Sequence, residues 1–180
     1  MKKLTIGTRG SKLALKQTDI VRARLEALYP DMELSTRIIT TTGDTTWDKP
    51  LHLVGGKGLF VKEIEDALLN EEIDIAVHSV KDIPTELPET LVLGAVLERE
   101  ERRDAFISFR YRGLSDLPSG ATIGTGSLRR KSQLLHVRKD LQIVPIRGYI
   151  DTLIRKLETE NLDAIILAFA GIVRIGLADR

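Results

Sequence analysis

Segment 74–84 reads Asp-Ile-Ala-Val-His-Ser-Val-Lys-Asp-Ile-Pro and decides the fold. The apolar residues 75–77 suffice for one buried strand of an α/β sheet, and the proline ends regular structure soon after them. The side chains that follow supply a hydroxyl, a cation and a carboxylate, from Ser79, Lys81 and Asp82. Ligands of open α/β sheets bind outside this carboxyl edge, so the segment predicts a binding or catalytic site. An ordinary strand exit with a solvated Lys-Asp pair is the alternative.

The composition is typical of a folded protein without disulfides. Of the 180 residues, 42% are hydrophobic and none is cysteine, which excludes disulfides, thiolate metal sites and a cysteine nucleophile within the chain. The formal net charge of +1 argues against a general polyanion binder. No apolar run approaches the ~20 residues that a membrane span needs. The start of the chain lacks the apolar region of a signal peptide, so we expect a cytoplasmic protein.

The first half of the chain alternates strands with helices, as α/β domains do. The expected elements are strands over 4–8, 32–40, 75–77 and 91–96, and helices over 11–29 and 60–68. Arg9 and Ser11 fall at the first strand-to-helix turn, where backbone N–H groups and a cation favour an anion. Ser11 can also cap the helix, and an exposed arginine beside a helix cap is the alternative interpretation.

Between residues 40 and 58 the periodic pattern vanishes. This loop ends in Gly55-Gly56-Lys57-Gly58, where the glycines let the backbone approach a ligand and Lys57 supplies a cation. The spacing is not that of a phosphate-binding P-loop. A ligand-binding loop and a flexible surface loop both stay open.

A dense run of mixed charges at residues 98–104 marks the expected domain boundary, because it contains no apolar residue. We place domain 1 at 1–98, a hinge at 99–104 and domain 2 at 105–180. A solvated helix end is the alternative for this run.

The second half repeats the pattern of the first. It opens with the segment 105–108, and the expected elements are strands over 121–125, 141–146 and 163–167, and helices from Ser127 onward and over 152–160. Arg129 and Arg130 lie on the first turn of the helix that Ser127 caps. Cations at this end oppose the helix dipole, which suggests that they face an anion.

Five turns after strands therefore carry the polar residues of the candidate site. They contain Arg9 and Ser11; Ser79, Lys81 and Asp82; Thr125, Ser127, Arg129 and Arg130; Arg147 and Gly148; and Arg174. If these turns converge on a cleft between two α/β domains, that cleft is rich in arginine, which binds carboxylates and phosphates in a bidentate manner. The residues alone predict a polyanion-binding cleft, with nucleic acid disfavoured by the nearly neutral charge and the low aromatic content.

Five motifs resemble the porphobilinogen deaminase (hydroxymethylbilane synthase) family, in the right order over essentially the whole chain. They are Arg-Gly-Ser-Lys-Leu-Ala at 9–14, Gly-Gly-Lys-Gly-Leu-Phe at 55–60, Ala-Val-His-Ser-Val-Lys-Asp at 76–82, Gly-Thr-Gly-Ser-Leu-Arg-Arg at 124–130 and Ile-Ile-Leu-Ala at 165–168. The set of motifs, rather than any one of them, makes the resemblance specific.

The resemblance implies an enzyme of tetrapyrrole biosynthesis that joins four porphobilinogen molecules head to tail and releases ammonia at each step. It implies a dipyrromethane cofactor, held as a primer by a thioether bond to a cysteine, and a monomeric cytoplasmic protein without nucleic-acid or membrane partners. Members of this family have two domains that resemble type II periplasmic binding proteins, with mixed sheets flanked by helices and the active site between them. A smaller third domain holds the cysteine. The acetate and propionate groups of the pyrroles would account for the arginines.

The resemblance also implies roles for individual residues. Asp82 matches the family's catalytic aspartate, and a carboxylate there can stabilise the cation that forms when ammonia departs. The cofactor-binding positions are Ser79, Lys81, Asp82, Thr125, Ser127, Arg129, Arg130, Arg147 and Gly148. The substrate-binding positions are Arg9, Ser11, Arg147 and Arg174, and Lys57 lies in the family's mobile loop. No metal is implied.

Three departures from the family pattern bear on function. The sequence stops at Arg180, before the segment that completes domain 1 and before the cysteine-bearing domain, which predicts exposed apolar surface and an inactive chain. Tyr149 stands at the position of an asparagine, and Leu153 at that of an arginine whose carboxylate contact is lost. The alternative function is therefore a non-catalytic carboxylate-binding module of the periplasmic-binding type.

Overall fold

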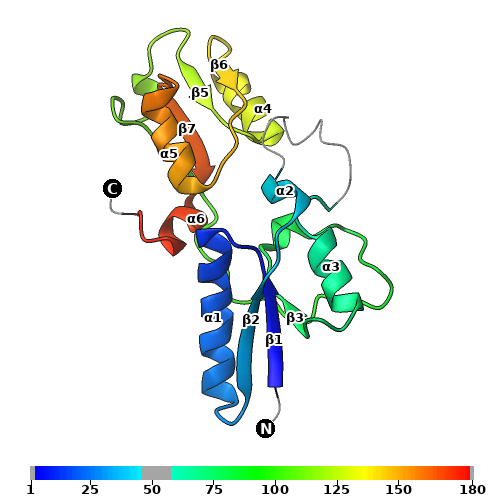
Figure 1. Ribbon diagram of the computed structural model, residues 1–180. Helices are drawn as coiled ribbons and strands as arrows, with labels where there is room; N and C mark the ends of the chain where they lie inside the picture. Colours follow the sequence, from blue (N-terminus) through cyan, green and yellow to red (C-terminus); the bar gives the residue numbers. More distant parts are fainter. Residues whose placement is uncertain (1–2, 46–57, 179–180) are drawn as a thin grey trace. The chain divides into compact units, whose positions relative to one another are not determined.

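The computed structural model describes residues 3–45 and 58–178 (Figure 1). The chain divides into two compact units, one comprising residues 3–45 and 58–98 and the other residues 99–178. The division falls between Glu98 and Arg99, inside the run of mixed charges. Lys57 lies outside the described residues.

The first unit contains a parallel three-stranded sheet with the strand order β2-β1-β3. Its elements are β1 (Lys3–Thr8), α1 (Lys12–Leu28), β2 (Glu33–Ile38), α2 (Thr42–Thr45), α3 (Lys62–Leu69), β3 (Ile75–Ala76) and the 3-10 turn η1 (Val80–Asp82). The core of this unit contains Ile64 and Ala67, which lie three residues apart on one face of α3 and pack with Ile73.

Strand β3 is shorter than the sequence predicts. Only Ile75 and Ala76 pair with β1, and both side chains are half-buried. The buried apolar residue near this strand is Ile73, which lies two residues before β3 and is 3% exposed. Gly7 of β1 makes room for it, since a Cβ at that position would lie 2.2 Å from the Ile73 side chain.

The strand predicted over residues 91–96 is wrong. Residues 91–100 have no regular secondary structure, and Val92 and Val96 are 82% and 65% exposed. A strand forms only where a neighbouring strand completes its hydrogen bonds, and no described residue pairs with this segment. These side chains contribute exposed apolar surface to this unit.

The expected irregular loop after β2 begins instead with the one-turn helix α2. Gly43 of this turn donates its N–H to the Leu59 carbonyl at 2.7 Å. A Cβ at Gly43 would lie 2.2 Å from the Phe60 ring, so only glycine allows the turn to approach this closely.

The second unit contains a mixed four-stranded sheet with the strand order β4-β7-β5-β6, in which only β4 is antiparallel to its neighbour. Its elements are β4 (Asp104–Ile107), the 3-10 turn η2 (Leu114–Asp116), β5 (Thr122–Gly124), α4 (Leu128–Val137), β6 (Gln142–Val144), α5 (Ile150–Thr159), β7 (Ala164–Ala168) and α6 (Phe169–Arg174). Helix α6 was not predicted, and Asp104, which was placed in the hinge, begins β4.

Strand β7 is buried on both faces. Ile165 and Leu167 pack into one core cluster, which includes residues from α5 and α6, whereas Ala164 and Ile166 pack into a second cluster on the opposite face. Helices α5 and α6 both contact β7 (Figure 1). The alternation of faces follows from the two-residue period of a strand. The predicted α/β class, with sheets flanked by helices, is confirmed.

Candidate functional site

Strand pairing in the first unit brings two of the predicted turns to one edge of the sheet. Strands β1 and β3 run parallel, with Gly7 opposite Ala76, so the residues that follow each strand emerge on the same side. Arg9 follows β1, and Ser79 to Asp82 follow β3. The structure therefore groups Arg9 with Ser79, Lys81 and Asp82, as the sequence predicts.

His78 interacts electrostatically with two members of this group, Asp82 and Arg9. Burial lowers the pKa of His78 below its usual value, Asp82 acts to raise it and Arg9 acts to lower it. The imidazole is therefore neutral near pH 7. Reasoning from the sequence did not include His78 among the site residues, although it stands directly before Ser79.

The predicted residues of η1 differ in exposure. Lys81 is exposed and Asp82 is half-buried, and the Asp82 N–H donates to the Ser79 carbonyl at 2.9 Å. The Ser79 hydroxyl accepts a hydrogen bond from the Gln17 side chain of α1 at 2.8 Å. Gln17 thus fixes the start of the turn that carries the carboxylate. It was also missed, because a single glutamine on a helix gives no signal in the sequence.

Ser11 is the N-cap of α1, as predicted. Its Oγ accepts a hydrogen bond from the Ala14 N–H at 3.2 Å, and the residue is 8% exposed. The oxygen is engaged by the helix, so the hydroxyl hydrogen is the part of Ser11 that can bind an anion.

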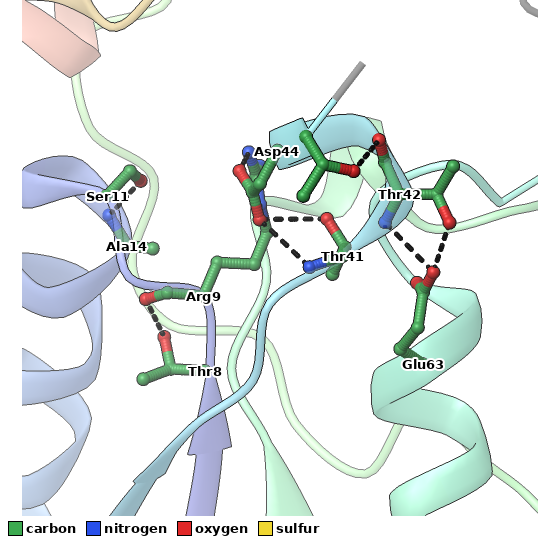
Figure 2. A network of polar contacts seen from close by, with 9 residues as sticks. Thr8, Arg9, Ser11, Ala14, Thr41, Thr42, Asp44 and Glu63 are labelled. Atoms are coloured by element: carbon green, nitrogen blue, oxygen red, sulfur yellow. Dashed lines mark hydrogen bonds and ion pairs between the residues drawn. The ribbon is translucent and has the colours of Figure 1, made fainter.

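Asp44 holds the guanidinium of Arg9 (Figure 2). Nε of Arg9 lies 3.2 and 3.1 Å from the two carboxylate oxygens, and Nη2 donates to Oδ1. The Thr41 hydroxyl also donates to this carboxylate, at 2.8 Å. The Phe60 ring lies against the guanidinium, with 4.2 Å from Cζ to the ring centroid. Sequence reasoning missed Asp44, because 35 residues separate it from Arg9.

The pKa of Asp44 is below its usual value. Burial acts to raise the pKa, but the hydrogen bonds from Arg9 and Thr41 and the charge of Arg9 outweigh this effect. The carboxylate therefore stays ionised at neutral pH and keeps its ion pair with Arg9.

The second unit brings the turns after β5, β6 and β7 to one edge, because these three strands are parallel. Thr125 follows β5 and is 4% exposed; its hydroxyl accepts the Ser127 N–H at 3.3 Å. Ser127 caps α4, as predicted, by accepting the Arg130 N–H at 3.4 Å. A Cβ at Gly126 would lie 2.8 Å from the Ile146 carbonyl oxygen, so the turns after β5 and β6 nearly touch.

Arg129 and Arg130 share one predicted role but have different surroundings. The Arg130 side chain is 15% exposed and forms an ion pair with Asp104 of β4 at 2.7 Å. The Arg129 side chain is 67% exposed, with Asp104 4.0 Å away and a long hydrogen bond of 3.4 Å to Gln133. Arg129 is therefore the more accessible cation of the two.

The remaining predicted site residues are Arg147 and Gly148, in the turn after β6, and Arg174, at the end of α6. Arg147 and Gly148 come after β6, and Gly148 has a φ of 147°, in the region that favours glycine. Arg174 is the last residue of α6, and its buried Nε has no hydrogen-bond partner among the described residues. A buried donor without a partner requires an explanation, such as a water molecule or a ligand that completes its hydrogen bond.

Both departures from the family motif lie at the start of α5, and the structure explains the one at Leu153. Leu153 is 8% exposed and packs in the core cluster with Leu157 and Ile165, so this position serves packing in this chain. Tyr149 is the N-cap of α5 without a side-chain cap bond, and it is 36% exposed.

Among the described residues, neither a metal-binding group of side chains nor a membrane-spanning helix is found. Within residues 3–45 and 58–178, no group of three or more His, Cys, Asp or Glu is placed to hold a metal ion. In the same residues, no helix combines the length and the apolar character needed to cross a membrane.

A family model described as "Porphobilinogen deaminase, dipyromethane cofactor binding domain" matches residues 4–180. The chain belongs to the porphobilinogen deaminase family. It is 58% identical over 179 residues to a porphobilinogen deaminase of Pelobacter propionicus, covering 99% of this chain and 57% of the relative. It is 56% identical over 177 residues to that of Lawsonia intracellularis, covering 98% of this chain and 57% of the relative. The chain thus spans little more than half the length of these curated relatives.

Two solved structures show a weaker likeness. One is the CcmR regulatory domain of Synechocystis PCC6803 in complex with 2-PG, with a TM-score of 0.40 and 14% identity over 96% of this chain and 75% of that one. The other is a putative L-cystine ABC transporter from Listeria monocytogenes, with a TM-score of 0.41 and 16% identity over 94% of this chain and 71% of that one. Both TM-scores are below 0.5, and the α/β class rests on the sheets and helices described above.

The family model's name assigns a dipyrromethane cofactor to this domain. Two arginines of the second unit fit a ligand that carries carboxylates. Arg174 has a buried donor without a partner in the described part of the chain, and the Arg129 side chain is largely exposed. Arginine donors of this kind bind carboxylates through charge-assisted hydrogen bonds.

Proposed function

We propose that the protein carrying this chain joins four porphobilinogen molecules head to tail into hydroxymethylbilane and releases one ammonia at each step. The strand-end arginines carry the proposal, because the pyrroles of substrate and product bear acetate and propionate groups that such arginines bind. The match to the family model over residues 4–180 supports the reaction class. We further propose that the protein acts as a cytoplasmic monomer.

In this proposal, the dipyrromethane cofactor supplies the pyrrole carbon to which the first substrate is joined. The residues that would hold it are Ser79, Lys81, Asp82, Thr125, Ser127, Arg129, Arg130, Arg147 and Gly148. The residues that would hold the carboxylates of incoming porphobilinogen are Arg9, Ser11, Arg147 and Arg174. Lys57, in the glycine motif of residues 55–58, would also contribute to binding.

Asp82 is the proposed catalytic residue. When the aminomethyl group of porphobilinogen loses ammonia, the remaining pyrrole carries a positive charge, which a nearby carboxylate stabilises. The same carboxylate can accept a hydrogen bond from the pyrrole nitrogens while the new C–C bond forms and a ring proton leaves. The half-buried position of Asp82 after β3, with Arg9 and Lys81 at the same edge, supports this role.

The experiment is porphobilinogen turnover by the complete gene product and by its Asp82→Asn variant, followed through released ammonia and tetrapyrrole absorbance. We expect kcat to fall by roughly 100-fold or more, which is the size of a general acid–base or electrostatic contribution. Asp116→Asn in η2 is the matched control and should leave kcat unchanged.

Near-normal turnover by Asp82→Asn would exclude the proposed role of this residue. Absence of turnover in the unaltered protein, together with tight binding of a small carboxylate, would favour the non-catalytic binding module instead.

A further inference from the structure

The guanidinium of Arg9 has two edges, and Asp44 occupies one of them. Nε and Nη2 form the side-on edge, and both donate to the Asp44 carboxylate, with Nε 3.2 and 3.1 Å from its oxygens (Figure 2). The Phe60 ring covers one face of the guanidinium. The end-on edge, formed by Nη1 and the second Nη2 hydrogen, has no hydrogen-bond partner among residues 3–45 and 58–178.

Asp44 is itself held rigidly. Its side chain is 7% exposed, and it accepts hydrogen bonds from the Thr41 hydroxyl at 2.8 Å and the Thr41 N–H at 3.3 Å. The turn α2 that carries it is fixed to α3, because the Thr42 N–H donates to the Glu63 carboxylate at 2.9 Å. A carboxylate fixed in this way limits the rotation of Arg9 about its last side-chain bonds.

We propose that Asp44 is a positioning residue that holds Arg9 so that its end-on edge receives a carboxylate of the ligand. The identity of that ligand as porphobilinogen rests on the proposed function. The unoccupied edge of the Arg9 guanidinium by itself indicates only that a carboxylate can bind there. A guanidinium fixed along one edge loses little freedom when it binds a carboxylate bidentately along the other. Loss of Asp44 therefore weakens binding of the ligand more than it slows the chemical step.

The kinetic test compares Asp44→Asn, Arg9→Lys and the double variant in the complete gene product. We expect Asp44→Asn to raise KM for porphobilinogen about tenfold and to change kcat less than threefold. The double variant should have nearly the KM of Arg9→Lys, because Asp44 acts through Arg9.

Asp163→Asn is the matched control, since Asp163 also accepts hydrogen bonds from an arginine and a backbone N–H, Arg110 Nη2 at 2.9 Å and the Thr122 N–H at 2.8 Å. It should leave KM within twofold. An unchanged KM in Asp44→Asn, or an equal rise in Asp163→Asn, would overturn the proposal.

A second readout does not depend on turnover. In ¹⁵N NMR spectra of the arginine side chains, the signals of Arg9 are identified by their loss in Arg9→Lys, and sodium propionate is then titrated as the probe. We expect the Nη signals of Arg9 to shift and the Nε–H signal to stay in place with slow hydrogen exchange. In Asp44→Asn the Nε–H should exchange faster and the propionate-dependent shift should shrink.

The propionate titration separates the two proposals. If the unaltered protein binds propionate at Arg9 but does not turn over porphobilinogen, the proposed function fails and the positioning role stands. If propionate moves the Nε–H signal, the ligand displaces Asp44, and the positioning role is wrong. An absence of any propionate-dependent shift at Arg9 would also overturn it.

Discussion

Arg130 and Asp104 form a two-point ion pair between α4 and β4. Nε and Nη2 of Arg130 lie 3.0 and 2.7 Å from the two carboxylate oxygens, which is the side-on arrangement also found between Arg9 and Asp44. Nη1 of Arg130 donates to the Ile166 carbonyl of β7 at 3.4 Å. All three guanidinium nitrogens of Arg130 are therefore engaged within the second unit. The arginine that stays more accessible on this helix is Arg129.

Asp104→Asn should destabilise the second unit. The variant removes a charge-assisted pair from a guanidinium that is 15% exposed, and we expect the free energy of unfolding to fall by about 1–3 kcal/mol. Urea denaturation followed by circular dichroism measures the change. Arg129→Gln is the control and should change stability by less than about 0.5 kcal/mol, because its side chain is solvated. Equal losses in the two variants would show that the Asp104–Arg130 pair contributes no special stability.

The stability of the first unit should depend on pH through Asp44. Burial acts to raise the pKa of Asp44, but bonds from Arg9 and Thr41 outweigh it, so the folded-state pKa is below the unfolded value. The resulting stabilisation is fully present above the unfolded pKa of about 4 and is lost as the pH falls through the lower folded-state pKa. Urea titrations at several values between about pH 5 and about pH 2.5 should therefore show a steeper loss in the unaltered protein than in Asp44→Asn. Parallel curves would contradict the assigned cause.

Ser11→Ala should weaken α1 through loss of its N-cap. The Oγ of Ser11 satisfies the Ala14 N–H, and its removal should cost about 1 kcal/mol of stability. Ser11→Thr keeps the oxygen and should retain most of that stability. If Ser11 also binds a carboxylate through its hydroxyl hydrogen, Ser11→Ala should raise KM for porphobilinogen as well, whereas a cap alone would leave KM unchanged. Unfolding and steady-state measurements on the same preparations separate the two effects.

The local elements could be predicted because neighbouring residues determine them. The apolar stripe of α1 and the capping serines Ser11 and Ser127 lie within a few residues of the bonds that they make, and the structure confirms both caps. The five motifs also identified the family, because each is a continuous segment whose residue types can be compared directly with the family pattern. The roles of the individual site residues stay predictions.

The strand predicted over 91–96 failed for a reason that the sequence could not show. Its apolar residues favour a strand, but a strand needs a partner, and pairing depends on segments far away in the chain. Leu153 illustrates the same limit, since only its burial with Leu157 and Ile165 shows that this position packs in the core.

The sequence by itself therefore determined the α/β order, the helix caps, the family and the set of arginines at the ends of strands. Only the tertiary structure decided which donors of those arginines are available, because their carboxylate partners come from distant segments. Asp44 lies 35 residues from Arg9, and Asp104 lies 26 residues from Arg130. Ion pairs over such separations form only after the strands have paired and brought the loop ends together.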